Sequence, residues 1–354
     1  MAGPYRWLRQ ILSALPPEAA HRLTIRALRA GFSPGGRAAD APLLTTRVWG
    51  LQFPNPVGLS AGFDKDAEVY AALLRLGFGF VEVGSITPQP QLGNPKPRVF
   101  RLPDNEAVIN RLGFNSAGLA AAVTNLRQRR SDRIGIVGIN VGKNRDSADA
   151  AADYAAGAAA LAPLADYLVI NVSSPNTPGL RALQEANALR ALLDRVQAAR
   201  HAAAPERPPP LLLKIAPDLA PAAARDLVQV AAAGGVDGLI VGNTTTSRPP
   251  DLRGRHVRES GGLSGRPLFA LSTELLREVY RFTEGRLPLI GVGGIASGAD
   301  AYAKIRAGAS LVQLYTALIY HGPGLIDRIK HDLAACLRAD GFATVADAVG
   351  ADHR

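Results

Sequence analysis

The segment Asn171-Val172-Ser173-Ser174-Pro175-Asn176-Thr177-Pro178 holds the densest set of side chains that could do chemistry. It supplies two amides and three hydroxyls, groups that both donate and accept hydrogen bonds. Each proline fixes its own φ angle and restricts the residue before it, so this loop has little main-chain freedom to lose when it holds a ligand. Ser, Asn and Pro are also the residues of an ordinary surface turn. The loop alone therefore does not decide between a ligand site and a turn.

The loop follows Tyr167–Ile170, an apolar run that is typical of a buried strand. Similar short runs recur from about residue 55 onward, separated by stretches of helical length. The eight predicted strands are Val57–Leu59, Phe80–Val83, Ile136–Asn140, Leu168–Asn171, Leu211–Ile215, Gly238–Val241, Leu289–Gly291 and Leu311–Leu314. The helical patterns between them include Ala67–Leu76, Leu180–Arg200, Ala222–Ala233 and Ala299–Ala307. Alternating strands and helices predict an α/β fold, and eight repeats favour a closed (β/α)₈ TIM barrel over a doubly wound open sheet.

Two further segments precede the first predicted barrel strand. Thr46–Phe53 has the pattern of a short hairpin, which we expect to plug the floor of the barrel. Pro34-Gly35-Gly36 is typical of a linker between the barrel and an N-terminal helical extension.

Polar residues follow nearly every predicted strand, at the end of the barrel where catalytic groups gather. These exits are Ser60–Lys65, Gly84–Ser85, Asn140, Asn171 with Ser174, Lys214, Gly242–Thr244, Gly291–Ile295 and Tyr315–Thr316. The last two follow strands seven and eight, where barrels commonly bind phosphate through backbone N–H groups. The pattern therefore predicts one site for a phosphorylated ligand.

Lys65 and Lys214 permit two kinds of chemistry at such a site. A desolvated lysine forms a Schiff base with a carbonyl substrate, as in a barrel aldolase. Alternatively, both lysines are permanent cations that stabilise an electron-rich cofactor. The second reading is favoured by four amides that suit the edges of a flat heterocycle, at Asn140, Asn171, Asn176 and Asn243.

Composition excludes several classes of function. The 354 residues, 47% of them hydrophobic, suit one large α/β domain with an appendage or two ordinary domains. The single cysteine, Cys336, excludes an internal disulfide framework and fits a reducing compartment. The six histidines form no close ligand pair, so we expect no metal site. No apolar run reaches the length of a membrane span.

The N-terminal segment carries much of the positive charge. Residues 1–50 hold seven arginines against two acidic residues, a net charge of +5 out of the chain's +10. Apolar residues recur there at helical spacing, at Trp7, Leu8, Ile11, Leu12 and Leu15, and a second helical pattern after Pro16-Pro17 aligns Arg22, Arg26 and Arg29. A basic amphipathic pair favours contact with anionic lipid. The alternative is a helical hairpin packed on its own domain, and nucleic acid is less favoured because no binding motif accompanies the charge.

Six motifs, in order along the chain, resemble the dihydroorotate dehydrogenase family, specifically its quinone-reducing, membrane-associated class (class 2). They are Ala61–Lys65, Gly93–Arg98, Asn110–Asn115, Asn171–Pro178, Gly261–Pro267 and Gly291–Ile295. The resemblance runs from about residue 5 to residue 338. It implies an FMN-dependent oxidation of dihydroorotate to orotate in de novo pyrimidine biosynthesis, with a membrane quinone as electron acceptor.

The resemblance also implies roles for single residues. Ser174 falls at the position of the general base, with Thr177 and Phe114 beside it. The implied substrate-binding residues are Lys65, Asn110, Arg111, Leu112, Gly113, Phe114, Asn171, Asn176, Asn243 and Thr244. The implied FMN-binding residues are Ala61, Gly62, Phe63, Asp64, Lys65, Ser85, Asn140, Asn171, Lys214, Gly242, Gly265, Gly294, Tyr315 and Thr316. His21, Arg101 and Tyr315 match the route of the quinone, although for His21 a histidine that only packs between helices is an equal alternative.

A mechanism follows from these roles. Serine is a poor base at its ordinary pKa, so Ser174 must pass the C5 proton onward while a hydride leaves C6 for the flavin. Lys214 would stabilise the reduced flavin. Relatives that use a cysteine base are disfavoured because the loop supplies serine and Cys336 lies far downstream. Ser85 and Gly242 stand where some relatives have threonine, which leaves individual flavin hydrogen bonds open.

We therefore expect three segments: an amphipathic helical pair at residues 1–38, an FMN-binding barrel at 39–340 and a loosely held tail at 341–354. The expected location is the cytoplasmic face of the cell membrane, with peripheral lipid contact and no nucleic acid or obligate protein partner. Two rival classes stay open. A flavin barrel acting on RNA bases should have a basic C-terminal binding region, and a silent membrane scaffold has no use for a ring of polar strand ends.

Overall fold

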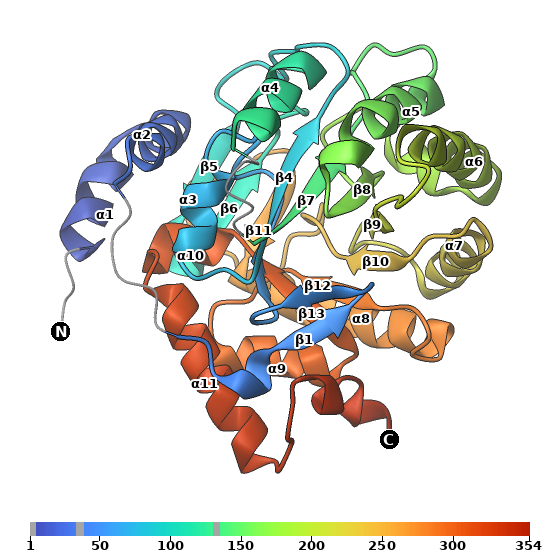
Figure 1. Cartoon of the computed structure of the whole chain (residues 1–354). Coiled ribbons are helices and arrows are strands. Elements are labelled where there is room, and N and C mark those ends of the chain that lie inside the picture. Colours follow the sequence, from blue (N-terminus) through green and yellow to red (C-terminus); the bar gives the residue numbers. More distant parts are fainter. Residues whose placement is uncertain (1–4, 33–38, 130–134) are drawn as a thin grey trace.

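The computed structural model describes residues 5–32, 39–129 and 135–354, and its centre is a closed barrel of eight parallel strands (Figure 1). The strands are β3 (Val57–Leu59), β4 (Phe80–Ile86), β7 (Ile136–Val141), β8 (Tyr167–Asn171), β9 (Leu211–Ile215), β10 (Gly238–Val241), β12 (Leu289–Val292) and β13 (Ala309–Leu314). Their order around the barrel is β10-β12-β13-β3-β4-β7-β8-β9. The predicted fold class is confirmed, and every predicted strand is present with ends extended by at most three residues.

The helices that surround the barrel are α3 (Tyr70–Arg75), α4 (Leu119–Arg129), α5 (Ala150–Leu161), α6 (Ala186–Ala203), α7 (Pro221–Ala233), α8 (Phe269–Thr283), α9 (Gly298–Arg306), α10 (Thr316–His321) and α11 (Leu325–Ala339). The helix expected from Ala67 begins at Tyr70 instead, because Ala67 has a φ of 57° and the Asp64 carboxylate accepts the N–H groups of Glu68 and Val69 at 2.7 and 2.8 Å. The helix expected from Leu180 begins at Ala186, after a 3₁₀ turn, Arg181–Gln184.

The floor of the barrel is closed by a hairpin, as predicted. β1 (Thr46–Val48) pairs antiparallel with β2 (Leu51–Phe53). The fully buried ring of Phe53 meets that of Phe80 edge-on at 5.4 Å, and Trp49 donates its indole N–H to the Asp237 carbonyl at 2.7 Å. The hairpin belongs to a separate apolar cluster with inward residues of the barrel strands, so it covers the end opposite the polar strand exits.

A second sheet, which the sequence patterns did not predict, lies over the mouth of the barrel. β5 (Val99–Leu102), β6 (Ala107–Asn110) and β11 (Gly262–Gly265) form an antiparallel sheet in the order β11-β6-β5. It contributes its own small apolar cluster. The sheet brings Asn110 and Gly265 to the same end of the molecule as the strand exits.

The N-terminal helices α1 (Tyr5–Ala14) and α2 (Pro17–Arg29) lie along one side of the barrel, with α1 against α10 and α2 against α3 and β5 (Figure 1). Tyr5 donates its hydroxyl to the Ile319 carbonyl at 2.8 Å, and the buried Arg98 guanidinium pairs with Glu18 at 2.8 Å. The predicted linker Pro34–Gly36 and the side chains of Trp7 and Leu8 lie outside the described residues.

The prediction of a loosely held C-terminal tail is wrong. The tail forms two 3₁₀ turns, Ala346–Ala348 and Ala351–His353, and both Val345 and Ala348 are fully buried. Arg306 on α9 pairs with Asp352 at 2.7 Å. Apolar burial and this ion pair hold the tail against α9. Other 3₁₀ turns among the described residues are Pro42–Leu44, Pro103–Asn105, Ala162–Leu164 and Arg266–Leu268.

Candidate active site and its relatives

A cavity of about 2100 Å³ begins at the carboxyl ends of the barrel strands and extends to the N-terminal helices. It brings together most of the residues predicted for the site. Those that line it are Ala61, Gly62, Phe63, Asp64, Lys65, Ser85, Asn110, Leu112, Gly113, Phe114, Asn171, Ser174, Asn176, Lys214, Asn243, Thr244, Gly265, Gly294, Tyr315, Thr316, His21 and Arg101. Arg111, Asn140, Thr177 and Gly242 do not line it.

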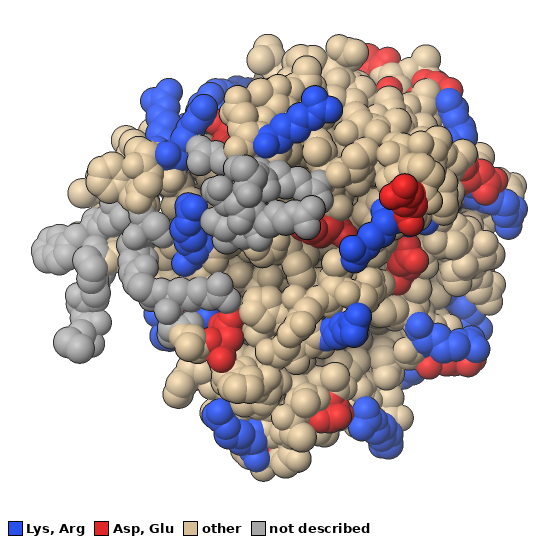
Figure 2. Space-filling view, in the orientation of Figure 1, with Lys and Arg blue, Asp and Glu red and all other residues tan. Residues whose placement is uncertain are grey.

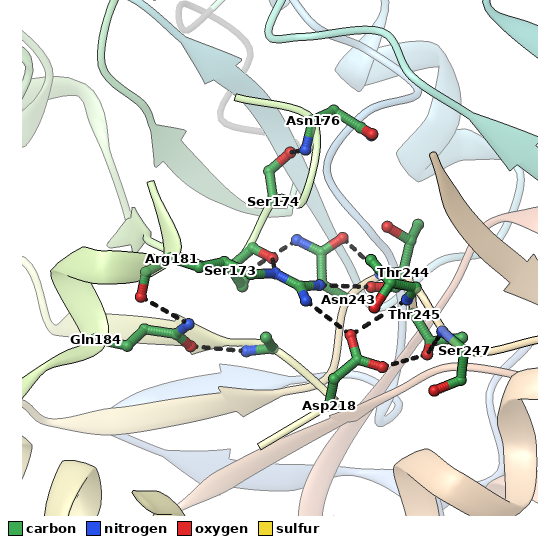
Figure 3. A network of polar contacts seen from close by, with 12 residues as sticks. Ser173, Ser174, Asn176, Arg181, Gln184, Asp218, Asn243, Thr244, Thr245 and Ser247 are labelled. Carbon is green, nitrogen blue, oxygen red and sulfur yellow. Dashed lines mark hydrogen bonds and ion pairs between the residues drawn. The ribbon is translucent and has the colours of Figure 1, made fainter. Parts of the chain in front are cut away.

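The asparagines of the site are joined by hydrogen bonds that all run in one direction, as Figure 3 shows for the outer half. The Thr244 N–H donates to Asn243 Oδ1 at 2.7 Å, and Asn243 Nδ2 donates to Ser173 Oγ at 2.8 Å. Ser173 Oγ in turn donates to Asn171 Oδ1 at 2.9 Å. Ser173 is fully buried, so its hydroxyl is fixed between two amides that face the cavity.

The inner half of this chain continues into the barrel. Asn171 Nδ2 donates to Ser85 Oγ at 2.9 Å, Ser85 donates to Asn140 Oδ1, and Asn140 Nδ2 donates to Glu82 Oε1 at 2.7 Å. We call this series, from Thr244 through Asn243, Ser173, Asn171, Ser85 and Asn140 to Glu82, the amide chain. Its two ends fix its direction, because a backbone N–H only donates and a carboxylate only accepts.

Glu82, which the sequence motifs did not indicate, joins the inner end of the amide chain to Lys214 and Gln313. It is fully buried on β4, and its second oxygen accepts from Gln313 Nε2 at 2.6 Å. Lys214 lies 3.3 Å from Glu82 Oε1 and also donates to Ser60 Oγ at 3.1 Å. The available signal was a charged residue inside an otherwise apolar barrel strand, which must have a buried partner. The pair places a cation at the base of the cavity.

The serine loop has its own internal geometry. Ser174 Oγ accepts the N–H of Asn176 at 3.3 Å, which fixes the hydroxyl relative to the main chain. Asn176 Nδ2 lies 3.3 Å from Asn110 Oδ1, so this loop meets β6 across the cavity. Thr177 is buried and its Oγ1 has no hydrogen-bond partner within the described protein. Phe114 is buried with a φ of 52°, an uncommon conformation for a bulky residue.

The guanidinium of Arg111, which the resemblance assigns to the substrate site, points away from the cavity. It donates to Glu259 Oε2 at 2.7 Å and to the Pro97 carbonyl at 3.0 Å. It also stacks over the ring of Phe100, 4.6 Å from the ring centroid. Its side chain therefore braces the sheet over the mouth and does not reach the cavity.

The glycine turn after β12 approaches other backbone very closely. Gly294 has a φ of 77°, and a Cβ added there would lie 2.5 Å from the Cα of Phe269. A side chain is therefore excluded, and the backbone at this position stays open to the cavity. Thr316 follows the neighbouring strand β13 and donates its hydroxyl to Ser264 at 2.8 Å. This is the corner where a phosphate fits a barrel of this kind.

Lys65 and its neighbour Asp64 have different hydrogen-bond partners. Lys65 Nζ donates to Asn115 Oδ1 at 2.9 Å, and burial lowers the pKa of Lys65 to about 8. Burial raises the pKa of Asp64 to about 7, opposed by the two backbone N–H groups that its carboxylate accepts. Asp64 thus binds main chain ahead of α3, while Lys65 keeps donors free toward the cavity.

The end of the cavity at α1 and α2 is lined by aromatic rings. His21 on α2 meets Phe63 edge-on at 5.2 Å, and Phe63 meets Tyr315 at 5.5 Å. Burial lowers the pKa of His21 to about 4, with the charges of Lys65 and Arg22 acting in the same sense, so the imidazole is neutral at pH 7. Arg101 donates to the Leu15 carbonyl at 2.9 Å and to two further carbonyls at the end of α1. The side chain of Arg101 therefore fixes α1 at the cavity wall.

The described residues hold neither a cluster of metal ligands nor a helix that could span a membrane. Within residues 5–32, 39–129 and 135–354, no three His, Cys, Asp or Glu residues are grouped so that they would hold a metal ion. Over the same residues, no helix combines the length and apolar character needed to cross a bilayer.

Comparisons with known proteins identify the family. The family model described as dihydroorotate dehydrogenase matches residues 43–337, most of the chain. This chain belongs to the dihydroorotate dehydrogenase family. A relative from Azorhizobium caulinodans, named dihydroorotate dehydrogenase (quinone), is 60% identical over 99% of both chains. The mitochondrial protein of the same name from Mus musculus is 55% identical over 96% of this chain and 88% of its own.

A solved structure supports the same assignment. The crystal structure of the Eimeria tenella enzyme in complex with ferulenol is 45% identical, with a TM-score of 0.91, and the match covers 97% of this chain and 99% of that one. The predicted family and its quinone-type class are thus confirmed.

Proposed function

We propose that this chain oxidises dihydroorotate through bound FMN and passes the electrons to a membrane quinone at the α1–α2 end of the cavity. The enzyme class follows from the family: it is a dihydroorotate dehydrogenase of the quinone type, acting in pyrimidine biosynthesis. The cofactor, the residue roles and the membrane contact are our inferences. The observation that carries them is a single cavity joining the polar strand ends to the N-terminal helices.

The described residues fit FMN. Bound there, FMN would accept a hydride from the substrate and release electrons to the quinone. Gly294 and Thr316 would hold its phosphate, since the turn leaves room for an anion against backbone. Lys214, paired with Glu82, would place a positive charge beside the ring system. Ser85, which accepts a hydrogen bond from Asn171 Nδ2 at 2.9 Å, would contact the ring system.

The residues around the serine loop would hold the substrate and take its proton. Asn171 and Asn243 present amides whose orientation is fixed by Ser173, so each offers a defined donor or acceptor to the ring. Ser174 Oγ would receive the proton while its own hydroxyl proton passes toward the unpartnered Thr177 Oγ1, which would release its own hydroxyl proton in turn. The buried Phe114 would exclude water from this path.

The N-terminal helices would meet the lipid. Large apolar side chains are exposed there, with Ile11 at 62%, Leu23 at 47% and Phe32 at 74%. Arg22 and Arg26 are exposed on the same helix as Leu23, and Figure 2 shows Lys and Arg side chains at the upper left of this face as well as elsewhere on it. An apolar rim beside cationic groups suits peripheral binding to the cytoplasmic face of the cell membrane. A quinone would then enter between α1 and α2.

Anaerobic spectroscopy tests the proposal. Dihydroorotate should bleach the flavin absorbance of the purified protein, and a short-chain quinone should restore it. Flavin that does not bleach would refute the substrate, and protein that cannot be loaded with FMN would refute the cofactor. Cosedimentation with vesicles of anionic lipid, compared with vesicles of neutral lipid, tests the membrane contact. Equal recovery in the supernatant from both would refute it.

A further inference from the structure

Arg181 makes contacts that no part of the proposed mechanism uses. It begins the 3₁₀ turn between the serine loop and α6, and it does not line the cavity. Its Nε donates to the Ser173 carbonyl at 3.1 Å, and Nη2 donates to the Thr244 carbonyl at 3.2 Å. Its remaining Nη1 pairs with Asp218 at 2.9 Å. Figure 3 shows the guanidinium between these partners.

These partners come from three consecutive strand exits. Ser173 follows β8, Asp218 follows β9 and Thr244 follows β10. Asp218 also accepts the Thr245 hydroxyl and, at 3.3 Å, the Thr246 N–H. The planar guanidinium offers several donors in one rigid fork, a geometry that a lysine ammonium does not reproduce.

We propose that Arg181 is a positioning residue that holds the serine loop and the Asn243–Thr244 loop as one unit. Ser173 precedes the residue proposed to take the proton, and Thr244 follows an amide proposed to hold the ring. One side chain outside the cavity thereby sets the distance between the proton acceptor and the ring-binding amides. Asp218 orients the guanidinium through its third nitrogen, Nη1.

The inference rests on the proposed function, and it predicts a selective defect. Replacing Arg181 would let the two loops shift independently. The glycine turn after β12 and Glu82 on β4 lie on other strands, and Lys214 lies within β9, ahead of the exit that carries Asp218. Misplacement of reacting groups by about 1 Å costs on the order of 100-fold in rate. We therefore expect Arg181→Met to slow flavin reduction at saturating dihydroorotate by about 10- to 100-fold and to weaken orotate binding by about 10-fold. FMN affinity and flavin reoxidation by a short-chain quinone should change less than about twofold, within the range of remote substitutions.

The experiment measures each step separately in the FMN-loaded full chain. Stopped-flow absorbance gives flavin reduction and quinone reoxidation, the flavin spectrum during orotate titration gives orotate affinity, and fluorescence gives FMN affinity. Arg195→Met is the matched control, because it removes an Arg–Asp pair of 2.7 Å, with Asp149, on the outer surface of α6. Arg181→Lys should fall between Arg181→Met and the parent, since one ammonium cannot serve all three partners.

Three results would overturn the inference. They are flavin reduction in Arg181→Met equal to that of the control, parallel loss of reduction and FMN affinity, and full recovery in Arg181→Lys. If Arg181→Met does not fold, Asp218→Asn carries the test with the same expected selectivity. A parent protein that dihydroorotate does not reduce would instead refute the proposed function, before any variant is compared.

Discussion

Lys304 on α9 should make stability rise with pH, because it is fully buried with hydroxyl partners and no carboxylate partner among the described residues within 4.0 Å. Its Nζ donates to Ser272 Oγ at 2.9 Å and to Thr273 Oγ1 at 3.0 Å, and it lies 5.0 Å from the ring centroid of Phe269. Burial lowers the pKa of Lys304 from 10.5 to about 7, only partly opposed by the charge of Asp300. The ammonium is thus disfavoured in the folded chain relative to the unfolded chain.

The sign and size of the effect follow from these values. Between pH 7 and 10.5 the unfolded chain binds more protons at Lys304 than the folded chain does, so the free energy of unfolding increases with pH in that window. Each pH unit inside the window contributes at most about 1.4 kcal/mol. From pH 7.5 to 9.5 we therefore expect this residue to add about 2 kcal/mol of stability.

Two substitutions isolate this effect from packing. Lys304→Met and Lys304→Gln both remove the titrating group, and the glutamine keeps a hydrogen-bonding group near the two hydroxyls. Urea unfolding at 25 °C, at several pH values and one saturating FMN concentration, gives the free energy of unfolding for each protein. The difference between parent and variant should rise by about 2 kcal/mol across the range for both variants. Parallel pH profiles of parent and variants would refute the reasoning.

Three further predictions concern other buried contacts. Glu82→Gln leaves the Lys214 ammonium buried without its carboxylate. Urea unfolding should therefore show a free energy of unfolding that is about 3 kcal/mol lower, and an unchanged midpoint would contradict this. Glu18→Gln removes the charge partner of Arg98, which ties α2 to the residue just before β5. Stopped-flow traces should show slower quinone reoxidation with unchanged reduction by dihydroorotate, and equal effects on both steps would count against this prediction. Ending the chain before Val345 exposes apolar surface of α9. The free energy of unfolding in the same urea assay should fall by about 2–3 kcal/mol. An unchanged free energy of unfolding would mean that the tail contributes nothing to stability.

The barrel was predictable because its strands are buried on both faces. Such strands appear as short uninterrupted apolar runs, and polar residues at their carboxyl ends have only one place to meet. The strand pattern assigns Asn171 and Lys214 to the fourth and fifth predicted strands, and the two residues are partners in the register of β8 and β9. The family motifs then supplied roles that spacing alone left open.

What the sequence missed depends on contacts between distant residues. β11 pairs with β6 through Gly262 and Asn110, and no local sequence pattern predicts a pairing between residues so far apart in the chain. Arg181 falls near the start of a predicted helix, Leu180–Arg200, and only the fold shows that residues of three strand exits meet at its guanidinium. The tail was judged by its position at the chain end, whereas the burial of Val345 and Ala348 decides its order.

The direction of the amide chain explains why an amide, and no acid, is required at its inner end. Asn140 is fully buried and lies 2.7 Å from Glu82 Oε1 through its Nδ2. An aspartate has nearly the same shape, but it would bring two carboxylates to hydrogen-bond distance in a buried site, and one of them would have to bind a proton. That proton would make one carboxyl a donor, and the order of donors and acceptors could then reverse through Ser85 to Asn171. On the proposed function, the amides that would hold the ring are therefore oriented by a residue that does not line the cavity.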